Sequence, residues 1–368
     1  MKVSFLTKTL EKGALLNVNS SLAKRVKERG GEVEFVSIER PDIVKLPLHV
    51  KECSIVNLDL VRVREYLFGF YRYLKITDSN VIFISGYLSS ILMIVASCFV
   101  QGSPRIVVHV HEMTSKYLSS RKGLVERYLA VPLMKLFFRR ASEVVSVSNA
   151  VARDLEELLS WKSPRICTLY NGIDVPEVLR KSKGASPFSR FIDNIDVPII
   201  LGVGRLEPEK RFEDLIYAFS RLVKKKDAAL IFLGEGSKQK DLNILAEKLS
   251  VGDRVHFLGY VENPYQCMSL ADLLVVTSER EGLCNVVIEA LACGCPVIST
   301  KCGGPEEVLS FSDQTWLVDV GDIEALSSSM LRLLAQPADW KVLRNRARDF
   351  DLKNKVYPRF DQILDRVL

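Results

Sequence analysis

Residues 278–300 read SEREGLCNVVIEALACGCPVIST and follow an apolar run at Leu273–Val276. The pattern predicts a strand, a polar loop, a helix over residues 286–293 and then a second strand. Asn285 suits the N-cap of this helix, and Gly294 suits a left-handed C-cap before Pro296. A helix that leads from one strand to the next is the repeating unit of α/β folds, so the stretch favours that fold class.

Two glutamates in this stretch are candidates for function. Glu289 interrupts a helix that is otherwise apolar on every side, and a buried carboxylate is unfavourable unless another group hydrogen-bonds to it. Glu281 lies in the preceding loop, where a strand ends and a helix begins. Open parallel sheets bind anionic ligands at such edges. We therefore predict that this loop belongs to the active site and that Glu289 has a partner.

The rest of the chain repeats the same pattern. It has 368 residues, 48% of them hydrophobic, which is enough for two domains with sizeable cores. Strand patterns alternate with helical patterns throughout, which predicts parallel, doubly wound sheets. The first series occupies residues 1–178 and the second residues 190–350, with a polar linker over residues 176–197. A helix over residues 355–368 ends the chain and is expected to pack back on the first domain.

The composition limits the class of protein. The net charge of +6 arises in the first half of the chain, which suits anionic lipid, a phosphate-bearing acceptor or nucleic acid, although a solvated surface explains it as well. Eight cysteines without a signal peptide predict reduced thiols in the cytoplasm. Four of them fall within residues 284–302 with no histidine nearby, so packing explains them better than zinc. No apolar run is long enough to cross a membrane.

Other loops of the second series also follow strand patterns. In GVGRLEPEK at residues 202–210, Arg205 and Lys210 are placed to grip a diphosphate from two sides, whereas an ordinary basic surface loop is the alternative. This loop lacks the third glycine of a dinucleotide fingerprint. Two later loops let the backbone approach a flat ligand such as a nucleobase, although each alone is an ordinary turn. Their candidate residues are Gly234, Gly259, Tyr260 and Val261.

Several motifs together resemble the retaining glycosyltransferases of family 4. These are GRLEPEK at 204–210, FLG at 257–259, EGLCNVVIEALACG at 281–294 and CGGPEEV at 302–308. VSVSNAV at 145–151 and YNGID at 170–174 are similar to the end of that family's N-terminal domain, so the likeness covers nearly the whole chain. The resemblance implies the GT-B fold, which consists of two Rossmann-like, doubly wound parallel-sheet domains that face a cleft. It implies an acceptor site in the first domain and a nucleotide-sugar site in the second.

The resemblance also implies roles for individual residues. Arg205 and Lys210 would hold the donor diphosphate, Glu289 would hydrogen-bond the ribose, and Glu281 would contact the sugar hydroxyls. Backbone N–H groups are implied to face the phosphate and the sugar at Gly282, Leu283, Cys284 and Asn285. The implied reaction transfers a hexose or N-acetylhexosamine from a nucleotide sugar to a glycan or lipid-linked acceptor, with retention of the anomeric configuration. A UDP-sugar is the expected donor. Its setting would be cell-surface polysaccharide or lipopolysaccharide synthesis.

No metal or other cofactor is expected. An Asp-x-Asp motif occurs at residues 349–351, but it lies in a charged helical region rather than at the end of a strand. Two other functions stay open. A nucleotide-sugar epimerase of the same fold would bind the same donor, and a non-catalytic nucleotide or nucleic-acid binding protein would account for the basic half but leaves Glu281 without a role. We expect no nucleic-acid partner, and a cytoplasmic location that can include the inner face of the cytoplasmic membrane.

In the first half, VVHVHEM at residues 107–113 places two histidines at the end of a strand. The family's histidine before an acidic residue matches His111, which Glu112 follows, so His111 is expected to orient an acceptor hydroxyl or the donor sugar. A satisfied core histidine is the alternative. His109 is expected to be buried and structural. The first loop departs from the family, because TLEKGALLN at residues 9–17 lacks the usual glycine pair.

Residues 121–140 combine basic and apolar side chains on one predicted helix. The basic residues are Arg121, Lys122, Arg127, Lys135, Arg139 and Arg140. Such a helix suits the surface of a membrane that contains anionic lipids. A core helix with a solvated face is the alternative, and it is slightly favoured.

Overall fold

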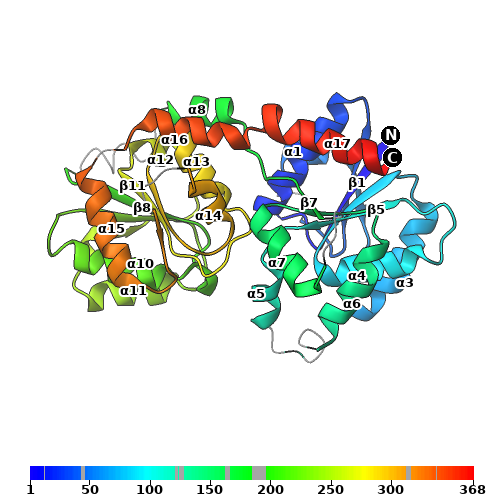
Figure 1. Ribbon diagram of the computed structural model, residues 1–368, viewed down its shortest axis with the longest axis horizontal. Coiled ribbons are helices and arrows are strands. Elements are labelled where there is room, and N and C mark those ends of the chain that lie inside the picture. Colours follow the sequence, from blue (N-terminus) through cyan, green and yellow to red (C-terminus); the bar gives the residue numbers. More distant parts are fainter. Residues whose placement is uncertain are drawn as a thin grey trace. The chain divides into compact units, whose positions relative to one another are not determined.

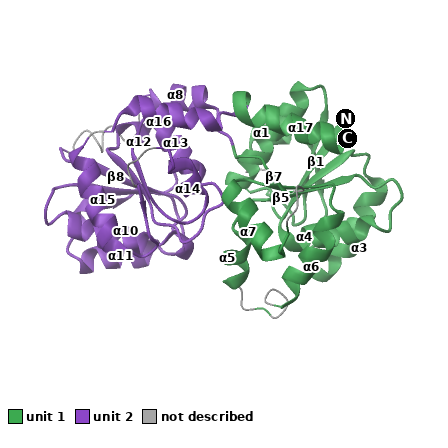
Figure 2. Cartoon of the chain, viewed as in Figure 1, with its two compact units in different colours: residues 1–171, 353–368 green, residues 172–352 purple. Residues whose placement is uncertain are grey.

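The computed structural model describes residues 1–11, 13–42, 46–120, 123, 128–161, 166–184, 196–311, 316–336 and 338–368. The chain divides into two compact units (Figures 1 and 2). Unit 1 contains residues 1–171 and 353–368, and unit 2 contains residues 172–352. Each unit has its own parallel sheet, so the predicted fold of two Rossmann-like domains is confirmed.

Unit 1 is built on a seven-stranded sheet in the order β3-β2-β1-β4-β5-β6-β7. Every strand pairing in it is parallel. The strands are β1 (Lys2–Thr7), β2 (Glu32–Ser37), β3 (Ser54–Asn57), β4 (Val81–Ser85), β5 (Arg105–Val110), β6 (Glu143–Ser146) and β7 (Ile166–Thr168). The central strands are buried on both faces, as parallel strands covered by helices should be.

The helices of unit 1 cover both faces of this sheet. Figure 1 shows α1 and α17 on one face and α3, α4 and α6 on the other. The helices are α1 (Ala14–Glu28), α2 (Leu48–Lys51), α3 (Val63–Ile76), α4 (Tyr87–Ser97), α5 (Thr114–Ser119), α6 (Ala130–Phe137), η3 (Phe138–Arg140), α7 (Asn149–Leu159) and α17 (Tyr357–Val367). Helix α17 is the last of the chain and packs on unit 1 through the ring of Phe360, whose centroid lies 5.5 Å from that of Phe83. Asp361 adds an ion pair to Arg25 at 2.5 Å.

Unit 2 is built on a six-stranded sheet in the order β10-β9-β8-β11-β12-β13, again with parallel pairings. Its strands are β8 (Ile199–Val203), β9 (Ala229–Leu233), β10 (Val255–Phe257), β11 (Leu273–Val276), β12 (Val297–Thr300) and β13 (Leu317–Val318). Its helices are α8 (Val175–Ser182), η4 (Pro208–Lys210), α10 (Phe212–Leu222), α11 (Gln239–Lys248), η5 (Gly252–Arg254), α12 (Tyr265–Leu270), α13 (Asn285–Cys293), α14 (Gly304–Leu309), α15 (Ile323–Ala335), α16 (Trp340–Ala347) and η6 (Arg348–Phe350). The short helix η7 (Leu352–Val356) begins at the last residue of unit 2 and otherwise belongs to unit 1.

The start of the predicted linker is a helix, so that part of the prediction was wrong. Helix α8 begins where Asp174 caps it by accepting a hydrogen bond from the N–H of Glu177 at 3.1 Å. Pro176 lies in its first turn, a position that suits proline. Val175 and Val178 are buried, which ties the helix to unit 2. Residues 185–195 of the predicted linker lie outside the described residues.

Each sheet has one point at which the strand order reverses. In unit 1 it lies between β1 and β4, and in unit 2 it lies between β8 and β11. Open α/β sheets bind ligands at the carboxyl ends of the strands beside such a point. Within the described residues, no helix is long and apolar enough to cross a membrane.

Candidate active site

Two charged side chains meet at the reversal point of unit 2. Lys210 ends η4, in the loop that follows β8, and Glu281 lies in the loop that follows β11. The Nζ of Lys210 donates to Oε1 of Glu281 at 2.5 Å, and the hydroxyl of Ser278 donates to the same oxygen at 2.7 Å. The hydroxyl of Thr277 also donates to the backbone carbonyl of Lys210 at 2.7 Å. The two loops therefore hold each other at the place where the sequence predicts the donor site.

This ion pair is largely shielded from water. Only 20% of the Lys210 side chain and 14% of the Glu281 side chain are exposed. Burial is the largest single influence on the pKa of Lys210 and lowers it, but the charge of Glu281, its hydrogen bond and the nearby Cys284 together raise that pKa above its ordinary value. Lys210 therefore carries a fixed positive charge beside the strand ends. Because Glu281 neutralises it, a phosphate that approaches Lys210 competes with this carboxylate.

The structure leaves Arg205 apart from this pair. Its side chain is 74% exposed and forms an ion pair with Glu209 of the same loop at 2.8 Å. Arg205 thus lies in the predicted loop, but at its surface and not against Glu281.

Helix α13 begins one residue earlier than the sequence suggests. Cys284 is its N-cap and adopts a left-handed conformation with φ of 67°, so Asn285 is the first helical residue and not the cap. Nothing in the side chain of cysteine signals that conformation, which explains the error. The Oδ1 atom of Asn285 is buried and has no hydrogen-bond partner in the described structure. The C-cap prediction is confirmed, because Gly294 is left-handed with φ of 86°.

The loop that carries Glu281 is held from behind by helix α14. The N–H of Glu281 donates to the carbonyl of Cys302 at 2.8 Å, and the N–H of Gly304 donates to the carbonyl of Glu281 at 3.3 Å. A Cβ on Gly304 would lie 2.3 Å from the carbonyl oxygen of Gly282 and from Cα of Leu283. Glycine is therefore required there by the close approach of two backbones.

Glu289 is half-buried on α13 and has a hydrogen-bond partner, as its position in an apolar helix predicts. The hydroxyl of Tyr265, on α12, donates to Oε1 of Glu289 at 3.4 Å. Burial raises the pKa of Glu289 to about 7. Tyr265 was not predicted as a site residue from the sequence, and its place directly after Pro264 is the only local signal for it.

The glycine loops of unit 2 lie on the same edge. The N–H of Gly234 donates to the carbonyl of Gly259 at 2.7 Å, which joins the loops after β9 and β10. A Cβ on Gly234 would lie 1.9 Å from the carbonyl oxygen of Gly204, at the end of β8. The N–H of Tyr260 donates to Glu235 at 3.3 Å, and the Tyr260 ring is exposed. Val261 follows it and is half-buried.

The carboxyl edge of unit 1 holds the two histidines. His111 follows β5 directly, and its ring centroid lies 3.9 Å from that of His109. Both ring nitrogens of His109 and Nε2 of His111 are buried without a hydrogen-bond partner in the described structure. Burial lowers the pKa of His111 to about 3, and burial together with His111 lowers that of His109 well below its ordinary value. Both rings are therefore neutral, and His109 is buried as predicted.

These histidines line a cavity of about 210 Å³ beside the reversal point between β1 and β4. Most of its exposed lining is apolar. Its remaining lining residues are Lys8, Leu15, Ser85, Gly86, Tyr87, Val108, Val110, Glu112, Thr114, Tyr117, Met134 and Phe138. A cavity at this edge suits a substrate that contacts aromatic side chains and forms a hydrogen bond with a neutral imidazole.

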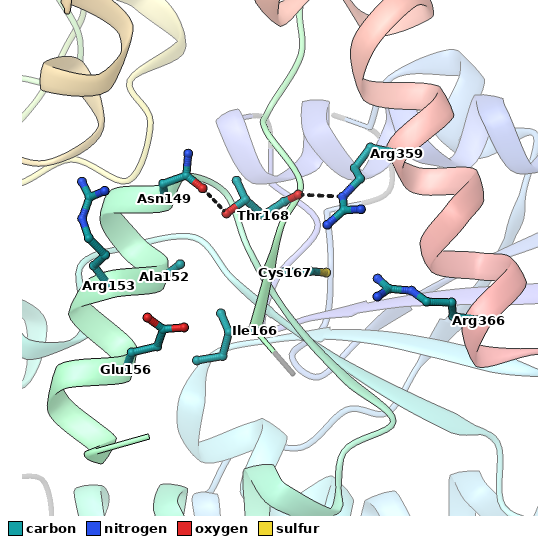
Figure 3. A pocket seen from close by; sticks show the side chains of 9 residues that line it. All are labelled: Asn149, Ala152, Arg153, Glu156, Ile166, Cys167, Thr168, Arg359 and Arg366. Carbon is teal, nitrogen blue, oxygen red and sulfur yellow. Dashed lines mark hydrogen bonds between the residues drawn. The ribbon is translucent and has the colours of Figure 1, made fainter. Parts of the chain in front are cut away.

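A second, larger groove of about 460 Å³ lies over the edge strand β7 (Figure 3). Three arginines from α7 and α17 line it, but two of them already have partners within unit 1. Arg366 forms an ion pair with Glu143 at 2.7 Å, and Nε of Arg359 donates to the carbonyl of Thr168 at 3.4 Å. The groove lies on the last strand of the sheet and not at the reversal point, so we do not include it in the candidate active site.

The cysteines near the site are packing residues. All eight cysteines of the chain are free thiols. Burial raises the pKa values of Cys293 and Cys302 to about 12, which leaves both as unreactive thiols at neutral pH. Within the described residues, no group of three or more His, Cys, Asp or Glu side chains is placed to hold a metal ion.

Comparison with known proteins agrees with this arrangement. Residues 187–350 match the family described as Glycosyl transferases group 1, and residues 17–177 match Glycosyltransferase Family 4. The N-acetyl-alpha-D-glucosaminyl L-malate synthase of Bacillus anthracis is 28% identical over 228 residues, which are 62% of this chain and 58% of that protein.

A second relative is the N-acetylgalactosamine-N,N'-diacetylbacillosaminyl-diphospho-undecaprenol 4-alpha-N-acetylgalactosaminyltransferase of Campylobacter jejuni. It is 29% identical over 243 residues, which are 65% of this chain and 63% of that protein. The matches thus span less than two thirds of the length of these two relatives.

Among solved structures, the Anabaena protein HepE in complex with UDP and glucose has a TM-score of 0.81 to this chain. The two share 21% identity, and the match covers 99% of each chain, so the likeness concerns the fold. Together the two family matches cover every strand of the two sheets except β1. The chain belongs to the family 4 glycosyltransferases and has the GT-B fold.

Proposed function

We propose that this protein transfers a hexose or an N-acetylhexosamine, with retention, from a nucleotide sugar to a glycan or lipid-linked acceptor in the synthesis of a cell-surface polysaccharide. The observation that carries this proposal is the ion pair between Lys210 and Glu281 at the reversal point between β8 and β11. It places a fixed cation and a carboxylate where an open parallel sheet binds its ligand. A pure nucleotide-binding protein has no need of the carboxylate.

The chemistry of the transfer explains why both charges are useful. As the bond between the anomeric carbon and the diphosphate breaks, negative charge grows on the leaving phosphate and positive charge on the sugar ring. Lys210 and the N-terminus of α13 stabilise the phosphate, and Arg205 can approach it from the exposed side of its loop. A preorganised donor of this kind typically contributes roughly 2.7–4 kcal/mol to the lowering of a barrier. With these cations in place, we propose that the transfer needs no metal ion.

Donor binding then separates Lys210 from Glu281. The diphosphate replaces Glu281 as the partner of Lys210, and Glu281 becomes free to accept hydrogen bonds from the sugar hydroxyls. Glu289 accepts a hydrogen bond from the ribose, beside Tyr265, and the backbone of the loops at Gly234 and Gly259 faces the base. The acceptor hydroxyl attacks the anomeric carbon on the face that the phosphate leaves. Its proton passes to the leaving phosphate oxygen, so the new bond keeps the configuration of the old one.

The choice of substrates follows the relatives. The structure of HepE holds UDP and glucose, which favours UDP as the nucleotide. The name of the Campylobacter jejuni relative gives a diphospho-undecaprenol acceptor, whereas that of the Bacillus anthracis relative gives L-malate. We propose a lipid-linked or glycan acceptor that unit 1 binds beside His111. Nucleotide sugars are cytoplasmic metabolites, so we propose that the enzyme works in the cytoplasm.

The decisive variant is Glu281→Ala. We expect transfer to be lost while the circular dichroism spectrum and the urea midpoint still report a folded protein. Wild-type rates in this variant would overturn the assignment. Because the acceptor is not yet identified, hydrolysis of UDP-sugars and GDP-sugars is measured first, and the sugar with the fastest hydrolysis is carried into the transfer assay.

A second measurement separates the transferase from an epimerase of the same fold. The protein is incubated with the donor alone, and the sugar is analysed by NMR. A transferase returns unchanged donor and slowly released sugar of the same configuration. An epimerised sugar would support the alternative. The same incubation with EDTA tests the metal, and loss of hydrolysis that Mg²⁺ or Mn²⁺ restores would refute metal independence.

A further inference from the structure

Helix α3 of unit 1 exposes an apolar and basic face. Its inner side is buried in the core through Tyr66, Phe70, Tyr73 and Leu74. On its outer side, Phe68 is 65% exposed and Ile76 is 81% exposed. The other exposed residues of the helix are Val63, Arg64, Leu67, Arg72 and Lys75. Large apolar side chains exposed together on one helix mark an interaction surface.

The charges on this helix have nearly one sign. The helix and its N-cap carry four basic residues, Arg62, Arg64, Arg72 and Lys75. Within the described structure, no carboxylate lies within ion-pair distance of Arg64, Arg72 or Lys75. The one acidic residue, Glu65, is used to cap the helix, because it accepts hydrogen bonds from the N–H groups of Val61 and Arg62 at 3.1 and 3.0 Å. The outward charge of α3 is therefore mainly positive, and Glu65 offsets part of it near Arg62 and Arg64.

The basic groups extend over the aromatic rings beside them. The guanidinium of Arg72 lies 5.9 Å from the centroid of the Phe68 ring, and the ammonium of Lys75 lies 5.2 Å from that of Tyr71. Long basic side chains placed over apolar surface let the rings enter an apolar phase while the charges stay at its polar boundary.

The neighbouring helices continue this face. Helix α4 carries no charged residue, and it packs between α3 and α6 on the same side of the sheet (Figure 1). Phe99, which follows α4, is 70% exposed, and Leu136 of α6 is exposed beside Lys135. We call the outer side of these three helices the α3–α4–α6 face. It is defined by Arg64, Leu67, Phe68, Arg72, Lys75, Ile76, Phe99, Lys135 and Leu136.

The membrane contact predicted from the sequence lies elsewhere, on residues 121–140. Arg121, Lys122 and Arg127 lie outside the described residues. In the helix that follows, Ala130 and Met134 are buried, and Val131, Leu133 and Phe137 pack against the core, so α6 is mainly a core helix with a narrow exposed strip. Helix α3 presents the wider surface.

We propose that the α3–α4–α6 face docks on a bilayer that contains anionic lipids, with α3 parallel to the membrane surface. Charge complementarity decides the partner. A second copy of the chain would bring the same positive face against this one, which is unfavourable, whereas a sheet of lipid phosphates neutralises it. The exposed Phe68, Ile76 and Phe99 then enter the boundary between headgroups and acyl chains, as in other interfacial helices.

Vesicle co-sedimentation tests the proposal on the full-length protein. The vesicles contain either phosphatidylcholine alone or equal parts of phosphatidylcholine and phosphatidylglycerol. We expect binding to the second kind, weakened by salt. Arg64→Gln, Arg72→Gln and Lys75→Gln together are expected to lower the partition coefficient by roughly two orders of magnitude, because each basic residue contributes about fivefold. Phe68→Ser alone is expected to lower it by about tenfold or more.

Matched variants in unit 2 serve as controls. Lys224→Gln, Lys225→Gln and Lys240→Gln remove the same charge from exposed positions, and Ile244→Ser removes an apolar side chain that is 58% exposed. These controls should bind like the wild type. Hydrolysis of UDP-sugar in the absence of lipid should stay unchanged in the α3 variants, which shows that they fold and separates this test from that of the proposed function.

Three outcomes would overturn the proposal. The first is equal binding to both kinds of vesicle, or none. The second is a loss of binding in the unit 2 controls as large as in the α3 variants, which would mean that net charge alone matters. The third is a dimer in solution, seen by analytical ultracentrifugation without lipid, that the Phe68→Ser variant abolishes, because the face would then join two copies of the chain.

Discussion

The ion pair between Lys210 and Glu281 should dominate both the stability of unit 2 and its affinity for the donor. The two groups lie 2.5 Å apart and are mostly buried. Loss of one partner of a buried pair typically costs 3–5 kcal/mol, because the other charge is left uncompensated. Since 20% of the Lys210 side chain is exposed, we expect the low end of that range, about 3 kcal/mol, for Glu281→Gln and for Lys210→Met.

The double variant provides the sharper measurement. With both charges removed, no buried charge is left without a partner. The loss of unfolding free energy in the double variant should therefore be about 2–3 kcal/mol smaller than the sum of the losses in the two single variants. Urea unfolding followed by tryptophan fluorescence reports the unfolding of both units, because Trp316 and Trp340 lie in unit 2 and Trp161 in unit 1. Additive costs in the double variant would refute the coupling between Lys210 and Glu281.

The affinity for UDP should respond in opposite directions in the two single variants. In the binding mode that we propose, the diphosphate must displace Glu281 from Lys210 in the wild type. Glu281→Gln frees the ammonium, so we expect UDP to bind more tightly in isothermal titration, although transfer is lost. Lys210→Met should weaken UDP instead. If both variants bind UDP as the wild type does, Lys210 has no contact with the diphosphate, and the proposed division of roles is wrong.

Three further predictions concern Glu289, Gly304 and His111, and Gly13 serves as the control for Gly304. Burial raises the pKa of Glu289 to about 7, so the stability that this group contributes is complete below the ordinary carboxyl pKa and is lost as the pH rises through about 7. Glu289→Gln should therefore flatten the pH dependence of the urea midpoint. An unchanged pH dependence in this variant contradicts the assignment. Gly304→Ala places a Cβ 2.3 Å from the carbonyl of Gly282 and should cost about 1–3 kcal/mol in urea unfolding. Gly13→Ala meets nothing within 4 Å and should stay within about 0.5 kcal/mol. His111→Ala should slow transfer, yet the wild-type pH–rate profile should show no inflection from this residue near its ordinary pKa, because burial lowers the pKa of His111 to about 3.

The fold was predictable where one local pattern sufficed. Strands such as β9 (Ala229–Leu233) and β11 (Leu273–Val276) match the apolar runs residue for residue, because a parallel strand covered on both faces is apolar throughout. Strand β3 (Ser54–Asn57) was missed because it lies at the edge of the sheet and is half exposed, so its pattern is weak. Helix α8 was missed because its capping residues stand next to a polar, lysine-rich stretch that reads as a linker.

The candidate site was predictable as a set of loops but not as a set of contacts. Glu281 and Lys210 each follow a strand, and that position can be read from the chain. Their pairing depends on β8 lying beside β11, although β9 and β10 come between them in the sequence. The left-handed Cys284 and the hydrogen bond from Tyr265 to Glu289 depend on tertiary packing in the same way. Single-sequence patterns carry no signal for either.

The two sheet edges differ in a way that bears on the reaction. The edge of unit 2 carries a buried cation and carboxylate, whereas the edge of unit 1 carries two buried imidazoles that stay neutral. In the proposed reaction the leaving diphosphate needs positive charge, and Lys210 of unit 2 is the residue that we propose to supply it. The acceptor hydroxyl needs orientation, and in the proposed mechanism its proton passes to the departing phosphate. A neutral imidazole that accepts or donates one hydrogen bond is therefore sufficient for the role that we propose for His111.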